Sequence, residues 1–167
     1  YIVRKATQGL ADYLNAHVRN ANVAIAYDSR IKSDVFAKET AAVLAANGIH
    51  AHIYPWLSPV PTLSFATRYL KCDAGVCVTA SHNPAKYNGY KVYGSDGCQI
   101  TSEMAKEVSD AIAKTDVFEG VKRMSFEDGV KEGRISYIKD EVINAFLQEV
   151  LNQSVIPEPC KGLKVVY

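Results

Sequence analysis

Three side chains that could take part in group transfer lie in one short stretch of the chain: Ser81, His82 and Lys91. Ser81 and His82, followed by Asn83, come directly after an apolar, β-rich run and precede Pro84. A proline cannot continue a strand ladder, and it keeps the residue before it out of helical geometry. The sequence therefore predicts an ordered loop that presents a hydroxyl, an imidazole and an amide at the end of a buried strand.

Lys91 belongs to a second β-rich run, residues 89–93, which a Gly-Ser-Asp-Gly turn ends. Side chains alternate in direction along a strand, so Lys91 faces away from Tyr90 and Val92. Lys91 can then project toward the serine loop while its neighbours pack. We expect one edge of the fold to combine a serine, a histidine and a lysine in a site.

The elements that must position this site alternate along the chain. Helical periodicity and β-rich apolar runs predict helices over residues 3–18, 33–47, 62–70, 102–115 and 136–151, and strands over residues 23–27, 49–54, 74–78 and 89–93. Such alternation implies parallel βαβ crossovers. The predicted fold is α/β, a three-layer α/β/α arrangement around a mixed, mostly parallel four-stranded sheet with one antiparallel edge strand.

The expected domain covers residues 1–152, with a polar connection over residues 116–134. Residues 153–162 contain two prolines and are interpreted as an interdomain linker. Residues 163–167 are expected to be the first strand of a following domain, cut off at its start. This organisation is typical of a piece of a longer protein.

Arg30 is predicted to share a rim with Ser81. In open α/β sheets ligands bind beyond the carboxyl ends of the strands, and the predicted loops 28–30, 58–62 and 79–84 all leave those ends. A helix starts shortly after Arg30, and the N-terminus of a helix favours an anion. The rim is therefore suited to a phosphate.

Composition excludes several classes of protein. Hydrophobic residues make up 48% and charged residues 22%, as in globular domains, and a net charge of +1 argues against a nucleic-acid partner. The apolar runs are far shorter than the roughly 20 residues that span a bilayer, so no membrane partner is expected. The 4 cysteines form no Cys-x-x-Cys pair, which indicates neutral thiols in a reducing cytoplasm.

The motif Thr-Ala-Ser-His-Asn-Pro at residues 79–84, followed by Asn-Gly-Tyr-Lys at residues 88–91, resembles the phosphoserine loop and adjoining strand of the α-D-phosphohexomutases. This superfamily contains the phosphoglucomutases and phosphomannomutases. Segments 27–30 and 59–62 also resemble that family, in the right order, so the likeness covers nearly the whole chain as the first of four domains. The sequence around Lys91 resembles the glucose and mannose enzymes more closely than it resembles the glucosamine branch.

The resemblance implies interconversion of sugar 1-phosphate and 6-phosphate, with glucose as the first candidate sugar. Ser81 would carry the phosphoryl group, and a bisphosphorylated sugar such as glucose 1,6-bisphosphate would be the intermediate and activator. Lys91 would act as general acid/base or neutralise charge, and His82 would assist in the proton network. Arg30 would hold phosphate oxygens, and Asn83 would shape the loop and touch the phosphate.

The resemblance also implies a Mg²⁺ held by the phosphate on Ser81 and by an aspartate loop beyond Tyr167. The sugar-selecting and phosphate-gripping loops are expected there too, so the partners are a phosphosugar and the remaining domains of the same protein. The chain alone is expected to be inactive. Mannose or pentose specificity and a non-catalytic phosphosugar-binding domain remain the alternatives.

Two other classes fit the residues less well. A serine hydrolase would need an acidic partner for His82 and an oxyanion hole, and no Gly-x-Ser-x-Gly is present. A nucleotide-binding domain would need Gly-x-Gly-x-x-Gly after the first strand, where the chain has Tyr-Asp-Ser-Arg. His17, His50 and His52 are interpreted as ordinary helix and strand residues, and Tyr90 and Tyr93 as packing residues.

Overall fold

The computed structural model describes residues 1–155 and 162–166 and has one central sheet. The strands are β1 (Asn22–Tyr27), β2 (His50–Ile53), β3 (Ala74–Val78), β4 (Tyr90–Gly94) and β5 (Ile135–Tyr137). Their order in the sheet is β4-β3-β1-β2-β5. Strands β1, β2, β3 and β5 run parallel, and β4 lies antiparallel to β3 at one edge. The predicted mixed sheet with an antiparallel edge strand is confirmed.

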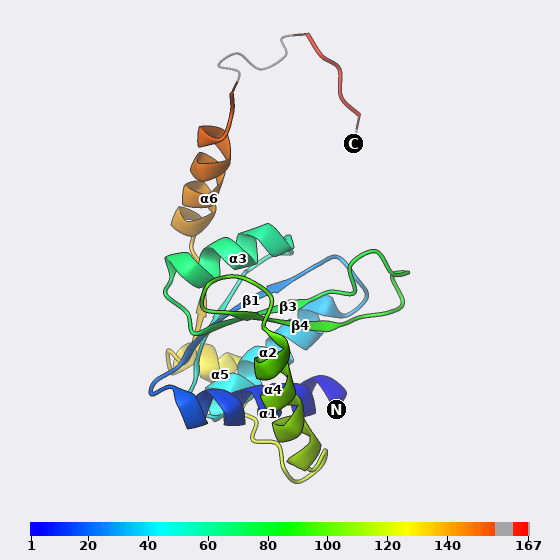
Figure 1. Ribbon diagram of the computed structural model, residues 1–167, viewed down its shortest axis with the longest axis vertical. Helices are drawn as coiled ribbons and strands as arrows, with labels where there is room; N and C mark the ends of the chain where they lie inside the picture. Colours follow the sequence, from blue (N-terminus) through cyan, green and yellow to red (C-terminus); the bar gives the residue numbers. More distant parts are fainter. Residues whose placement is uncertain (156–161, 167) are drawn as a thin grey trace.

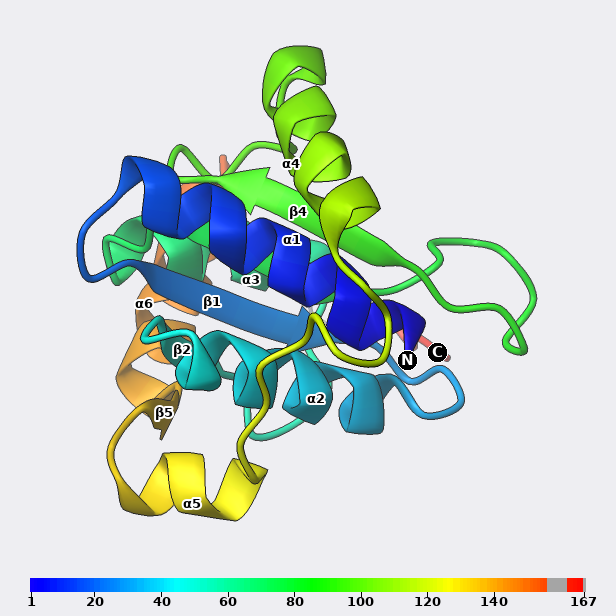
Figure 2. The same cartoon turned by 90° about the horizontal axis from the view of Figure 1, so that it is seen from below.

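The helices form one layer on each face of the sheet, as predicted (Figures 1 and 2). They are α1 (Ile2–His17), α2 (Ser33–Ala46), α3 (Val60–Tyr69), α4 (Ser102–Lys114), α5 (Phe126–Lys131) and α6 (Asp140–Asn152). Helices α1, α2, α4 and α5 cover one face, where Leu10, Leu44 and Val108 join the core around Ile25. Helices α3 and α6 cover the other face.

The predicted count of four strands is wrong, because β5 adds a fifth. Its three residues are too few to show a period, and two of them, Ser136 and Tyr137, fall in the helix predicted over residues 136–151, which begins only at Asp140. Strand β5 pairs with β2, and Ile135 is buried. The connection 116–134 is also more regular than expected, since it contains α5.

Beyond α6, the expected linker falls mostly on residues 156–161, which lie outside the described residues. Residues 162–166 have no strand pairing in the part of the chain that the structure describes, so the expected strand at 163–167 stays a prediction. Among the described residues, no helix is both long enough and apolar enough to cross a bilayer.

The rings of His50 and His52 lie side by side on β2, with centroids 4.4 Å apart and planes tilted by 38°, and His50 Nε2 lies 3.0 Å from Ser136 Oγ on β5. Burial, with a smaller effect of the charge of His50, lowers the pKa of His52 to about 4 from its usual 6.5. Burial also lowers the pKa of His50. The ring of His52 is therefore uncharged at neutral pH, and burial acts on His50 in the same direction.

This pair predicts a loss of stability in mild acid. Between pH 6.5 and about 4 the unfolded chain binds a proton at His52 that the folded chain does not, so the free energy of unfolding falls as the pH falls through that window. We expect His52→Gln to reduce this loss by on the order of 1 kcal/mol in urea unfolding at pH 7 and pH 4.5, with a remaining slope from His50. Glu39, whose pKa is lowered to about 2 chiefly by Arg123, loses its contribution as the pH falls from about 5 toward 2, and this loss is the same in the parent and in His52→Gln. An unchanged slope in His52→Gln would contradict the assignment.

Candidate active site

The serine of the predicted loop lies at the carboxyl end of β3. The strand ends at Val78, and the loop that follows extends beyond the sheet before returning as β4 (Figure 2). Ser81 is exposed and has φ of 55°, a left-handed conformation that residues other than glycine seldom adopt. The surrounding contacts must hold this conformation, and they are the basis of the site.

Lys91 reaches Ser81 across the antiparallel pair β3–β4. Its Nζ donates a hydrogen bond of 2.5 Å to Ser81 Oγ. In the register of the two strands Lys91 is opposite Cys77, whereas Tyr90 and Val92 pack into the core on the other face. The alternation expected for this strand is therefore observed, and it brings an ammonium group to the serine hydroxyl.

Asp28, directly after β1, is the centre of a hydrogen-bond network under the loop. Its carboxylate accepts hydrogen bonds from Thr79 Oγ1 at 2.6 Å, from Ser33 Oγ at 2.8 Å, and from the backbone N–H and Nε of Arg30, both at 3.0 Å. Burial acts to raise the pKa of Asp28, but these hydrogen bonds and the charge of Arg30 together lower it. Asp28 is thus a carboxylate at neutral pH and can orient every donor around it.

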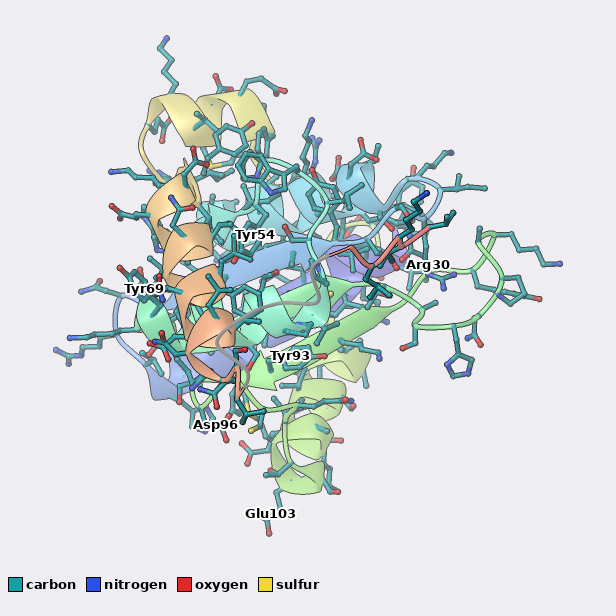
Figure 3. All side chains as sticks on the ribbon, turned by 90° about the horizontal axis from the view of Figure 1, so that it is seen from above. Arg30, Tyr54, Tyr69, Tyr93, Asp96 and Glu103 are labelled. Atoms are coloured by element: carbon teal, nitrogen blue, oxygen red, sulfur yellow. The ribbon has the colours of Figure 1, made fainter. Side chains whose placement is uncertain are left out.

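Arg30 joins the first loop to the serine loop. Its Nη2 donates to the carbonyl oxygen of Ser81 at 2.5 Å, and its Nη1 donates to the carbonyl oxygens of Pro84 and Tyr87 at 2.9 and 3.2 Å. Its side chain is only 10% exposed, and Figure 3 shows it at the end of the sheet from which the serine loop extends. Arg30 therefore shares the rim with Ser81 as expected, but four of its five N–H groups bind protein oxygens.

The two residues before β4 join the end of the serine loop to its beginning and to Ser33. Asn88 Nδ2 donates to Ser33 Oγ at 2.9 Å, and Thr79 N–H donates to the carbonyl oxygen of Gly89 at 3.1 Å. A Cβ at Gly89 would lie 2.6 Å from the carbonyl oxygen of Thr79, closer than such atoms approach. Only glycine fits here, because the two ends of the loop are in backbone contact.

The other two predicted site residues lie in the exposed part of the loop. The backbone N–H of Asn83 donates to the carbonyl oxygen of Ala80 at 3.1 Å, which closes a turn around Ser81. The side chains of Asn83 and His82 are exposed and make no hydrogen bond with any described residue. The structure thus brings Ser81, Lys91 and Arg30 together and leaves His82 and Asn83 open to a ligand.

Asp28, Thr79 and Asn88 were not predicted to act in the site. The sequence carried a signal for Asp28, because a carboxylate directly after a fully apolar strand must be partly buried and therefore needs donors. No comparable signal distinguished Thr79 or Asn88, whose roles depend on contacts between segments far apart in the chain.

The residues around Ser81 that the structure describes offer few ligands for a metal ion. The part of the chain that the structure describes contains no group of three or more His, Cys, Asp or Glu side chains placed to hold a metal ion. Asp28, the carboxylate beside Ser81, is already occupied by donors. A phosphate on Ser81 would add hard anionic oxygens of the kind that Mg²⁺ prefers. Among the described residues, only a phosphate on Ser81 would therefore provide a ligand for such an ion.

An exposed serine that accepts a hydrogen bond from a lysine, beyond the carboxyl end of a parallel strand, defines the class: an α/β/α domain with a serine–lysine pair on its rim. Residues 1–118 match the sequence model of the family described as phosphoglucomutase/phosphomannomutase, alpha/beta/alpha domain I. The chain belongs to this family.

The chain is similar to relatives that are named after three different sugars. It is 41% identical over 150 residues to a phosphoglucomutase of Staphylococcus saprophyticus, an alignment that covers 90% of this chain and 27% of the relative. It is 36% identical over 169 residues to a probable phosphomannomutase of Haemophilus influenzae, covering 99% and 33%. It is 36% identical over 172 residues to a phosphoribomutase of Saccharomyces cerevisiae, covering 96% and 27%. The chain thus spans about a quarter to a third of the length of these relatives.

Solved structures support the same fold. The crystal structure of a putative phosphomannomutase from Thermus thermophilus superposes with a TM-score of 0.69 at 25% identity, over 82% of this chain and 28% of that one. The open form of parafusin, a phosphoglucomutase from Paramecium, gives a TM-score of 0.75 over 92% of this chain and 32% of that one. At 16% identity the second match shows the fold alone.

Proposed function

We propose that the chain is the phosphoserine-bearing domain of a phosphohexomutase, with glucose 1-phosphate and glucose 6-phosphate as its first candidate substrates. The observation that carries this proposal is the hydrogen bond of 2.5 Å between Lys91 Nζ and Ser81 Oγ on the exposed rim of a domain of this family. A serine ester of phosphate is stable in water, and the phosphate adds about −1.5 to −2 charge at neutral pH.

In the proposed reaction, a phosphoryl group moves between Ser81 Oγ and a sugar hydroxyl. As the sugar hydroxyl attacks phosphorus and releases its proton to water, the P–Oγ bond breaks and Lys91 donates a proton to the departing Oγ. The bisphosphorylated sugar then presents its other phosphate. Ser81 Oγ attacks it, the neutral Lys91 takes up the proton of Ser81, and the departing sugar oxygen takes a proton from water. Positioning and charge stabilisation provide most of the rate in such a transfer.

The remaining predicted site residues have smaller proposed roles. Arg30 holds the loop through its carbonyl oxygens and has one N–H left with which to meet a phosphate oxygen. His82 and Asn83 are exposed beside Ser81 and free to hydrogen-bond the phosphosugar. Bound to the phosphate on Ser81, Mg²⁺ would neutralise charge on the phosphoryl group, with its other ligands from the rest of the protein.

We further propose that the rest of the same protein is the partner of this chain. The apolar stripe of α6 supports this, because its second half is uncovered: Leu147, Val150 and Leu151 are 50%, 52% and 65% exposed. Figure 1 shows α6 leading away from the other helices toward the carboxyl end of the chain.

The free thiols of Cys72, Cys77 and Cys98 suit a reducing compartment, and we place the protein in the cytoplasm.

The test of the proposed function is an assay of the full-length protein against the 1-phosphates of glucose, mannose and ribose, with a trace of the matching bisphosphate. We expect isomerisation of at least one sugar and, by mass spectrometry, phosphate on Ser81 in the resting enzyme. The relatives named phosphomannomutase and phosphoribomutase make mannose and ribose the second candidates. Binding of all three sugar phosphates without turnover, and no phosphate on Ser81, would favour a non-catalytic phosphosugar-binding protein.

A further inference from the structure

The backbone of Ser81 is held on both sides by hydrogen-bonded chains that lead to the loop after β1. On its amino side, the N–H of Ser81 donates to Thr79 Oγ1 at 3.1 Å, and Thr79 Oγ1 donates to Asp28 Oδ2 at 2.6 Å. On its carbonyl side, the oxygen of Ser81 accepts from Arg30 Nη2, and Arg30 Nε donates to the same Asp28 carboxylate. Both hydrogen-bonded chains that fix Ser81 therefore end on Asp28.

The Thr79 hydroxyl acts as a directional link in this arrangement. A hydroxyl has one proton and two lone pairs. The proton of Thr79 points at the ionised Asp28, so its lone pairs are left to accept from the N–H of Ser81. A hydrogen bond to a charged acceptor is also stronger than one between neutral groups. Thr79 is only 6% exposed, so water cannot readily take its place.

The hydrogen bond to Thr79 helps to hold Ser81 in a backbone conformation that it would not otherwise adopt. A left-handed conformation at a residue other than glycine costs of order 1 kcal/mol and persists only where its surroundings fix it. With φ of 55°, Ser81 directs its Oγ to Lys91 Nζ at 2.5 Å. Rotation of this residue toward an ordinary conformation would move Oγ away from the ammonium group.

We infer that Thr79 and Asp28 are positioning residues for phosphoryl transfer, which set the orientation of Ser81 toward Lys91 through the backbone of Ser81. The inference rests on the proposed function and adds to it two residues that do not touch the sugar. Misplacement of a reacting group by 1 Å can cost about 10²-fold in rate. The effect should therefore appear in the rate of transfer and not in the binding of substrate.

The test compares Thr79→Val with Thr79→Ser in the full-length protein. Valine keeps the shape of threonine and removes the hydroxyl, whereas serine keeps the hydroxyl. We expect Thr79→Val to lower kcat, and the single-turnover rate at which a sugar bisphosphate phosphorylates Ser81, by roughly 10- to 100-fold with KM within about twofold. Thr79→Ser should stay within about threefold of the parent in all three quantities.

Thr79→Ala is the second variant, because valine places a methyl group against a carboxylate and could reduce folding. Alanine leaves that space empty, and the melting temperature of each variant gives the folded fraction at the assay temperature. Equal kcat in Thr79→Ser and Thr79→Ala would overturn the inference, as would a loss confined to KM. Both results presuppose a parent enzyme that turns over through Ser81, so they are distinct from failure of the proposed function itself.

Discussion

Replacing Ser81 with alanine in the full-length protein is expected to abolish phosphosugar isomerisation, with a loss on the order of 10⁴-fold or more in kcat. The side chain of Ser81 is exposed, and its Oγ bonds only Lys91 among the described residues. No step of the proposed transfer can proceed without that oxygen, whereas the fold loses one hydrogen bond at its surface. Initial rates with glucose 1-phosphate, together with the melting temperature, measure both effects.

Two further variants make the result for Ser81 specific. Ser81→Gly also removes the hydroxyl but accepts the left-handed backbone at φ of 55° without strain, so it should be equally inactive. Ser95→Ala changes an exposed serine in the turn after β4, at the opposite end of the sheet, and should keep full activity. Isomerase activity retained in Ser81→Ala would contradict the phosphoserine mechanism.

The sheet was predictable where its strands carry their own signal. Strands β1 and β3 are fully apolar in their interior because both faces are covered by helices, and such runs are recognisable in any sequence. Strand β5 has three residues at an edge, so its existence depends on pairing with β2 and not on its own pattern. Helix α6 was predicted too long for the same reason, since Ile138 suits either element.

The sequence predicted the position of the site better than it predicted the hydrogen bonds within it. The rule that ligands bind beyond the carboxyl ends of parallel strands places Arg30 beside Ser81, and the structure does so. The sequence could not show that the guanidinium group of Arg30 is directed at three loop carbonyl oxygens. That direction depends on the path of the loop backbone in space. The same holds for Thr79, whose hydroxyl acts only because Asp28 lies beneath it.

Replacing Lys91 with methionine is expected to slow phosphoryl transfer by about 10²- to 10⁴-fold in both directions, the range that a positioned proton donor contributes. Methionine keeps most of the length of the side chain and removes the ammonium group that lies 2.5 Å from Ser81 Oγ. Lys91 is half-buried on an edge strand and forms no ion pair with any described residue, so the fold should tolerate the change. Single-turnover rates of Ser81 phosphorylation and dephosphorylation measure the two directions separately.

Lys91→Arg distinguishes the two roles proposed for the lysine. A guanidinium group keeps the positive charge but does not release a proton at neutral pH, so it can neutralise a phosphoryl group without acting as a base. We expect Lys91→Arg to remain nearly as slow as Lys91→Met if proton transfer limits the rate, and to recover most of the rate if charge is what matters. Lys86→Met is the matched control, because Lys86 lies in the same loop with its Nζ over the ring of Tyr87. A Lys91→Met enzyme as fast as Lys86→Met would remove Lys91 from the reaction altogether.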